Sequence, residues 1–308
     1  MVDDIMIKKT LFEKYEYWME FSKMKINAKI WILLAIFSSL IIGVVSYFVL
    51  DYLLNEFTLL PFALSISLFF FIIGLPYFKA MNIINSCEEN FSMALKQMAD
   101  VLRAGDTYES SLREVANSDY GRLSEEFNNS LRMLEDGENL ENSLSILSER
   151  IDSKLIRRTM VIVLEAIKAG GSLADILEEI SEDIRDLRKI ENSRRANTTM
   201  QFAFMLVAGA VISPAIFGEI TGVMELFSKV ALSMSDVSQA EVIAMQNFMY
   251  LVSQAYLIIQ VIATGLLMAI IRYGKFNKSI LYVPALILVS FIFYYGVLFV
   301  ARFMFVIK

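Results

Sequence analysis

Histidine is absent from this chain of 308 residues, and cysteine occurs once, at Cys87. The first absence removes the commonest general base and metal ligand. The second excludes a disulfide within the chain and any site built from several cysteines. No phosphate-binding loop occurs, because Gly274-Lys275 lacks the earlier glycine and the following hydroxyl residue of that motif. The sequence therefore predicts no enzyme, no cofactor and no metal. Cys87 is expected to be a small apolar residue at a helix start.

Two further classes of protein lack support. A nucleic-acid-binding protein needs a basic stripe, and this chain has none, with a formal net charge of −6. Membrane aspartyl proteases use a Gly-x-Gly-Asp motif and a second aspartate, because two close carboxylates must share a proton. Here Gly105-Asp106 follows Arg103 instead of a glycine, and no aspartate lies within a long apolar window. Both readings are rejected.

Apolar residues make up 56% of the chain, above the roughly 45–50% that is usual in soluble proteins. Five windows contain no charged residue, and each is long enough to cross a bilayer core of about 30 Å. Five such windows predict five transmembrane helices, at residues 30–50, 57–78, 196–218, 242–271 and 279–301.

Basic residues in the connecting segments predict the orientation. Lysines precede the first window, arginines and lysines precede the third, and Arg272, Lys275 and Lys278 separate the last two. The segment between the first two windows has no basic residue. The positive-inside rule then places the N-terminus, residues 80–195 and the 272–278 loop in the cytoplasm and the C-terminus outside the plasma (inner) membrane.

Residues 1–29 form a separate N-terminal segment before the first window. Within it, residues 5–27 are expected to form an amphipathic helix, with an aromatic-rich face that includes Tyr15 and Trp18, and lysines opposite. Such a helix suits the membrane interface. Packing on the cytoplasmic domain is the alternative, and the sequence does not choose between them.

Residues 80–195 contain an internal repeat. Gly105, Gly137 and Gly170 lie 32 and 33 residues apart, and in each copy an apolar residue follows at the third position and leucine at the seventh. A glycine can end a helix in the left-handed conformation. Thr107, Asn139 or Ser172 can then cap the next helix. Gly171 is assigned to the third turn.

Each repeat is thus expected to be a helical hairpin with its apolar positions packed inward. The predicted fold is an all-α, polytopic membrane protein with five transmembrane helices and one cytoplasmic six-helix bundle. The last bundle helix should continue into the third span, because no breaker separates them. The expected helices are 88–104, 107–117, 120–136, 139–150, 154–169 and 173–195.

The motifs Leu95–Leu112, Leu134–Leu144 and Glu165–Leu177, with two predicted spans before them and three after them, resemble the type II secretion system F-domain family. Its members are the membrane platforms of type IV pili, archaella, tight-adherence pili and type II secretion. The resemblance covers residues 90–220. It implies a non-catalytic protein that docks on a hexameric cytoplasmic secretion ATPase and couples it to movement of pilin-like subunits out of the membrane lipid.

Many members carry two such domains, and this chain has one. A homodimer, or a heterodimer with a second F-domain protein, is therefore expected. Basic residues are the candidates for contact with the ATPase, although each alone is equally well explained as a solvated charge. They are Arg272, Lys275 and Lys278 in the short loop, and Arg150, Lys154, Arg157 and Arg158 in the bundle.

Two other functions remain as alternatives. A transporter or channel needs a polar path through the membrane, and the polar residues in the spans are few, Gln254, Gln260 and Arg302 among them. A membrane sensor with a helical signalling domain should show long unbroken heptads. Here the glycines interrupt the helices at each repeat.

Overall fold

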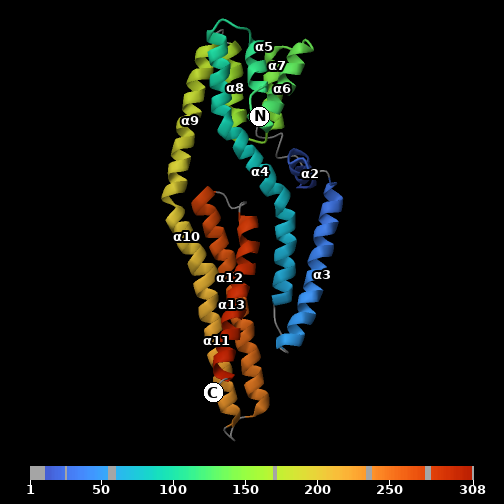
Figure 1. The fold of residues 1–308 in the computed structure, drawn as a ribbon, viewed down its shortest axis with the longest axis vertical. Coiled ribbons are helices and arrows are strands. Elements are labelled where there is room, and N and C mark those ends of the chain that lie inside the picture. The colour runs from blue at the N-terminus through green and yellow to red at the C-terminus, as the bar shows by residue number, and fades with distance from the viewer. Residues whose placement is uncertain are drawn as a thin grey trace. The chain divides into compact units, whose positions relative to one another are not determined.

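The computed structural model of the chain describes residues 11–24, 26–54, 60–168, 172–233, 238–274 and 279–306 (Figure 1). Every regular element in these ranges is a helix, which confirms the all-α prediction. The chain divides into two compact units. We call Lys79–Arg194 the repeat unit, and Met1–Phe78 with Arg195–Lys308 the membrane unit.

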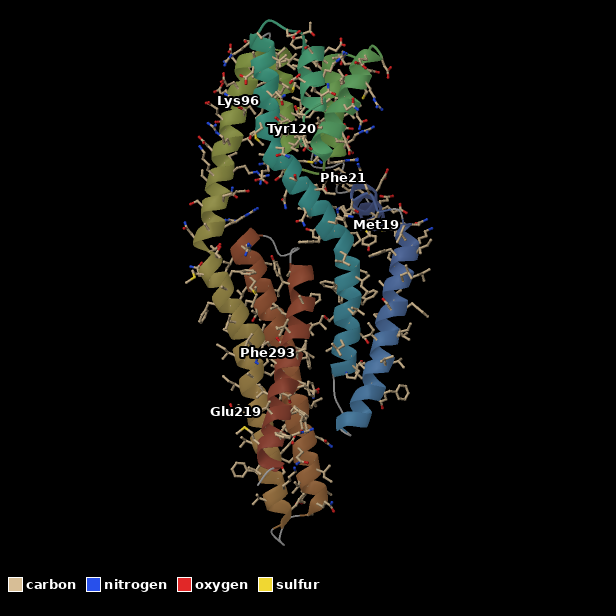
Figure 2. All side chains as sticks on the ribbon, in the orientation of Figure 1. Met19, Phe21, Lys96, Tyr120, Glu219 and Phe293 are labelled. Atoms are coloured by element: carbon tan, nitrogen blue, oxygen red, sulfur yellow. The ribbon has the colours of Figure 1, made fainter. Side chains whose placement is uncertain are left out.

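The membrane unit contains the long apolar helices. Five helical segments among the described residues are long and apolar enough to cross a membrane, as predicted. Figure 2 shows the matching chemistry: side-chain nitrogen and oxygen atoms are sparse on α3 and α11–α13 and frequent on α5–α9. The helices of this unit are α2 (Leu11–Phe21), α3 (Ala28–Leu54), the start of α4 (Leu60–Arg103), α10 (Thr199–Val207), the π-helix η1 (Ala208–Ile212), α11 (Ser213–Ser233), α12 (Gln239–Tyr273) and α13 (Ser279–Val306).

Helical structure extends further than the apolar windows. Residues 219–241, expected to be a loop, are largely helical, because α11 continues to Ser233 and α12 begins at Gln239. The charges of this stretch suggested a loop, but Glu225 is paired within the membrane unit and so does not end the helix. α4 likewise runs unbroken from the second window into the repeat unit. Cys87 therefore lies inside a helix, not at its start, and its side chain is buried.

Pro76 lies within α4 and removes one backbone donor from the helix. The carbonyl left without its usual partner is that of Ile72, four residues earlier. The indole Nε1 of Trp31 on α3 donates a hydrogen bond to this oxygen at 3.1 Å, and the Tyr15 hydroxyl on α2 donates to the next carbonyl, of Ile73, at 3.3 Å. The proline thus frees the Ile72 carbonyl to bind α3, and the neighbouring Ile73 carbonyl binds α2.

Replacing Trp31 with phenylalanine keeps most of the ring contact and removes this donor. We expect the protein to lose about 1–2 kcal/mol of stability, because the Ile72 carbonyl would remain unsatisfied in an apolar setting. Unfolding in mixed micelles measures the change. A Trp31→Phe variant as stable as the wild type would contradict this role for the indole.

Helix α2 packs within the membrane unit. Tyr15 and Met19 are buried together with Ala28 at the start of α3, and Trp18 and Ile73 pack against the same cluster. Figure 2 labels Met19 and Phe21 on this helix. The apolar face of α2 is therefore directed at α3 and α4, a third arrangement beyond the two that the sequence left open.

The repeat unit is built from short helices and from parts of the two long ones. The seventh-position leucines of the repeat, Leu112, Leu144 and Leu177, are each at most 1% exposed and lie in its core. The third positions are less uniform, since Tyr108 is half exposed. The helices are the end of α4, α5 (Tyr108–Ala116), α6 (Arg122–Glu135), α7 (Leu140–Arg150), α8 (Lys154–Lys168) and most of α9 (Leu173–Asn197).

Two of the repeat glycines end helices in the left-handed conformation, with φ of +88° at Gly105 and +95° at Gly137. After each, a backbone N–H bonds to a carbonyl five residues back, which is the Schellman arrangement. Thr107 and Asn139 then accept hydrogen bonds from the backbone of α5 and α7, at 3.2 and 2.7 Å. The third turn, Gly170 and Gly171, lies outside the described residues.

Substitution of these glycines tests the turns. A Cβ at Gly105 or Gly137 would meet no atom within 4 Å, so the cost is conformational alone. We expect valine at either position to destabilise the repeat unit by about 1–2 kcal/mol, and asparagine by less, because asparagine tolerates this conformation. Thermal melts of the full chain in detergent compare the stabilities of the variants. Equal melting temperatures of the Val and Asn variants would contradict this prediction.

Candidate functional site

The four candidate cations of the repeat unit differ in their surroundings. Arg150 lies 3.6 Å from a carboxylate oxygen of Glu126, and Arg157 lies 3.8 Å from Asp152. Lys154 and Arg158 are exposed and stand one turn apart on α8. Among the described residues Lys154 and Arg158 form no ion pair, so their charges are the more available ones of these four.

Glu126 gives Arg150 a role within the fold. This carboxylate is only 1% exposed, on α6. Arg122 forms an ion pair with it at 2.8 Å, and the Asn129 amide donates a hydrogen bond at 3.0 Å. A buried carboxylate needs such partners, because an unpaired buried charge is strongly destabilising. Arg150 helps to neutralise Glu126, which explains this arginine without an external partner. No pattern in the sequence indicated this buried carboxylate.

Arg272 lies in the last turn of α12, in the membrane unit. Its guanidinium carbon is 4.7 Å from the centre of the Phe202 ring on α10, a cation–π distance. Gly274 ends α12 with φ of +65°, and its N–H bonds to the Ile270 carbonyl at 2.7 Å. Gly274 is therefore a helix cap. The other two cations of this loop, Lys275 and Lys278, lie outside the described residues.

Ion pairs tie α4 to α9 near one end of the repeat unit. Glu88 on α4 accepts hydrogen bonds of 2.6 Å from Arg188 on α9 and from the Ser153 hydroxyl before α8. The same Ser153 oxygen caps α8 by accepting from the Ile156 N–H at 3.2 Å. One carboxylate thus joins three helices.

A second tie lies near the other end of the same helix pair. Arg103 at the end of α4 donates to Asp175 at 2.8 Å and also pairs with Glu178, both on α9. The hydrogen bond from Arg103, with a second from Ser172, lowers the pKa of Asp175. Because α4 and α9 are the two chain connections to the membrane unit, these ties hold both connections to one body.

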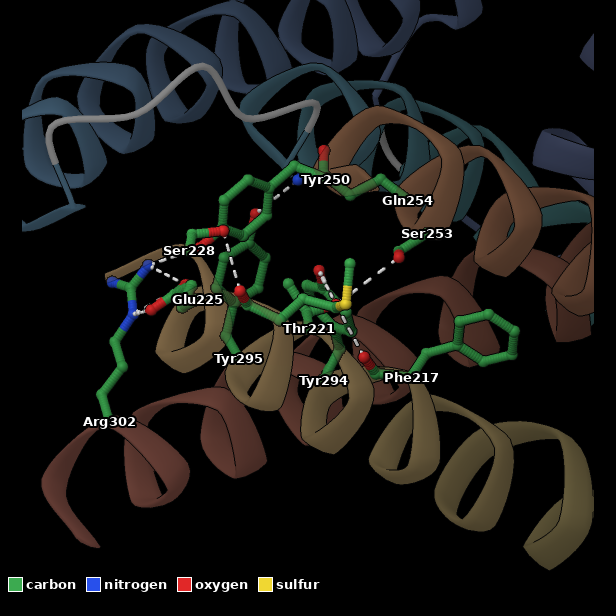
Figure 3. Close-up of polar contacts among 11 residues, drawn as sticks. Phe217, Thr221, Glu225, Ser228, Tyr250, Ser253, Gln254, Tyr294, Tyr295 and Arg302 are labelled. Atoms are coloured by element: carbon green, nitrogen blue, oxygen red, sulfur yellow. Dashed lines mark hydrogen bonds and ion pairs between the residues drawn. The ribbon is translucent and has the colours of Figure 1, made fainter. Parts of the chain in front are cut away.

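The membrane unit contains an ion pair between helices (Figure 3). Arg302 on α13 donates to both carboxylate oxygens of Glu225 on α11, at 2.6–3.1 Å, and to the Tyr250 hydroxyl on α12 at 2.8 Å. The side chains are 24% and 12% exposed for the arginine and the glutamate. From the sequence, Arg302 was counted among the few polar residues of the spans. Glu225, between the third and fourth predicted spans, was not identified.

Hydroxyl and amide groups continue this network between the same helices. Thr221 on α11 lies 3.2 Å from the Tyr294 hydroxyl and 3.5 Å from the Ser253 hydroxyl, and the Gln254 amide donates to the Tyr295 hydroxyl at 3.2 Å. Figure 3 shows these groups directed at one another from α11, α12 and α13. These contacts join helices and give a transporter no support.

Small residues allow α11 to approach α13 closely. Gly218 and Gly222 form a Gly-x-x-x-Gly pair. A Cβ at Gly218 would lie 2.5 Å from the Tyr294 carbonyl oxygen, and one at Gly222 would lie 2.7 Å from the Ala301 Cβ. Packing through small residues is a common way to associate helices in lipid. The motif is used here within the chain, and the spacing in the sequence could have revealed it.

Comparison with known proteins finds one matching family and one similar protein. Residues 94–222 match the family described as Type II secretion system (T2SS), protein F. An uncharacterized protein of Methanocaldococcus jannaschii is 28% identical over 140 residues, which are 44% of this chain and 47% of that protein. The match thus spans about half the length of the curated relative. No solved structure matches the chain.

The matched region begins in α4, includes the rest of the repeat unit and ends at Gly222, within the membrane unit. It therefore includes the Arg103–Asp175 tie and the glycine contacts with α13, whereas Glu88 of the other tie precedes it. This agrees with the resemblance found in residues 90–220. Residues 94–222 therefore match the type II secretion system F-domain family.

Proposed function

We propose that this protein is the membrane platform of a type II-like secretion system or of a pilus or archaellum-type filament. In this role it couples a hexameric cytoplasmic secretion ATPase to the movement of pilin-like subunits out of the membrane. The observation that carries the proposal is the F-family domain between membrane-crossing helices, joined to them by continuous helices. The repeat unit and the N-terminus face the cytoplasm, and the C-terminus lies outside.

The structure suits transmission of force better than catalysis. α4 begins among the apolar segments and ends in the repeat unit, and α9 leads into α10 with a single residue, Thr198, between them. Because the Glu88–Arg188 and Arg103–Asp175 ties hold α4 to α9, a push on the repeat unit would act on both connections together. The Glu225–Arg302 pair and the glycine contacts then hold α11 to α13.

Docking on the ATPase is assigned to the exposed cations of α8, with Arg272, Lys275 and Lys278 as a second contact. Lys154 and Arg158 are the better test, because Arg272 packs on Phe202 and its loss would disturb the fold. Surface charges attract an acidic partner over a distance limited to about 8–10 Å at physiological salt. Binding through these residues should therefore weaken as salt is raised.

The double variant Lys154→Glu/Arg158→Glu tests this contact. We expect the ATPase to bind at least about tenfold more weakly, equivalent to about 1.4 kcal/mol, and filament assembly or secretion to fall while protein levels stay normal. Binding to the detergent-solubilised full chain provides the measurement.

Arg185→Glu/Lys189→Glu is the matched control. It makes the same change of charge at the same spacing on exposed positions of α9. Equal loss of binding in the two double variants would mean that only net charge matters. Wild-type affinity of the α8 variant would remove α8 from the interface.

One F domain per chain favours a dimer, either of two copies or with a second F-domain protein. A transporter or channel and a helical sensor remain the alternatives. The bonded polar groups of the membrane unit disfavour the first, and the glycine-ended helices of the repeat unit disfavour the second. Molecular mass in a mild detergent distinguishes one copy from two.

A further inference from the structure

An apolar groove lies in the membrane unit between α4 on one side and α12 and α13 on the other. Its volume is about 790 Å³, and its walls are almost entirely carbon. Along α4 the lining runs from Phe62 to Tyr77, which at 1.5 Å per residue is about 22 Å. Trp18 of α2 also lines it, with its ring centre 4.7 Å from that of Tyr77.

The exposure of the lining residues shows that the groove opens to the surrounding lipid. Phe62, Ile66 and Ile262 line it and are also 58%, 55% and 40% exposed. They belong to helices that are long and apolar enough to cross a membrane. Exposed apolar side chains on such helices face lipid acyl chains, so the groove is continuous with the lipid-facing surface. A groove of this kind in a bilayer is filled by whatever apolar group fits.

We propose that this groove is a binding site for the acyl chain of a membrane lipid, with its mouth at the aromatic pair Trp18–Tyr77. The lining favours a lipid, because its described residues include no charged side chain and are continuous with the surface that faces lipid acyl chains. Aromatic side chains of this type concentrate at membrane–water interfaces, which sets the level of the headgroup.

The groove separates α4 from the α12–α13 pair over part of their length. Direct contact between α4 and α13 includes the Ser67 hydroxyl, which donates to the Pro284 carbonyl at 2.6 Å beside the groove, and Ala63 in the adjoining core cluster. An acyl chain seated there adds packing contacts between α4 and the α12–α13 pair. A lipid in this position would therefore help to hold α4 against α12 and α13.

Filling the groove with a side chain tests the site. Ile262→Trp places a large ring into it, and Ile259→Trp is the matched control, because Ile259 is 68% exposed on the same helix and does not line the groove. Each full-length protein is reconstituted with dioleoyl-phosphatidylcholine, purified in mild detergent and washed. Retained lipid per chain is then quantified by mass spectrometry.

We expect the wild type and Ile259→Trp to retain the same amount of lipid, and Ile262→Trp to retain roughly twofold less, because retention between apolar partners rests on packing. Ile66→Trp fills the groove from α4 and should repeat the loss if Ile262→Trp folds poorly. Equal lipid in all four proteins would overturn the proposal. Release of a co-purified polypeptide by the groove variants, in place of lipid, would also overturn it.

Discussion

Removing the Arg302 side chain is expected to be among the most damaging changes to this protein. Arg302→Met leaves the Glu225 carboxylate without its bidentate partner between α11 and α13, and it also removes the bond to Tyr250. Breaking a buried pair from one side costs about 3–5 kcal/mol, and partial exposure of this pair lowers the expected loss to about 2–4 kcal/mol. Unfolding of the detergent-solubilised chain measures it.

A second substitution separates the charge from the packing. Arg302→Met/Glu225→Leu removes both charges and should recover most of the lost stability, because replacing both partners with apolar groups is often nearly neutral. A double variant as unstable as Arg302→Met alone would mean that the ion pair is not the cause of the loss.

Gly218→Leu is expected to cost about 3 kcal/mol, at the upper end of overpacking effects. Any Cβ there meets the Tyr294 carbonyl oxygen at 2.5 Å, and a backbone atom cannot rotate away. Gly218→Ala should cost less but still destabilise. The helices α11 and α13 would have to separate, which would also disturb the Thr221–Tyr294 contact. Unfolding in mixed micelles again provides the measurement.

Gly296 provides the control for this prediction. It lies on α13, and a Cβ built there meets nothing within 4 Å. Gly296→Ala should therefore leave stability unchanged or raise it slightly, because alanine favours a helix. If Gly218→Ala and Gly296→Ala unfold alike, close packing of α11 on α13 is not important for stability.

Local signals made most of the fold predictable. Charge-free windows mark the membrane helices because a bilayer excludes charge over a fixed length. Gly105 and Gly137 mark helix ends because few other residues adopt their φ, and Leu112, Leu144 and Leu177 mark the core through their common position in the repeat. Each of these depends on residues close together in the sequence.

Features that depend on distant residues were missed. Glu225 and Arg302 are 77 residues apart, and a lone glutamate after an apolar window resembled the beginning of a loop. Pro76 lies inside its helix, where a donor from α3 satisfies the one carbonyl that the proline leaves without its usual partner. Glu88 could not be recognised as a contact between helices, since Arg188 and Ser153 lie far from it in the sequence. The burial of Glu126 likewise depends on the packing of the repeat unit. The docking surface could be narrowed only when the structure paired Arg150 with Glu126 and Arg157 with Asp152, which left Lys154 and Arg158.

The most direct test of the platform role is recovery of the intact protein from gently solubilised membranes of cells that are building the filament or secreting. We predict that a hexameric ATPase is recovered with it, that high salt releases this ATPase, and that the remaining protein hydrolyses no ATP. Robust ATP hydrolysis by the protein alone, or its recovery from chemically cross-linked membranes without any ATPase, would contradict the account.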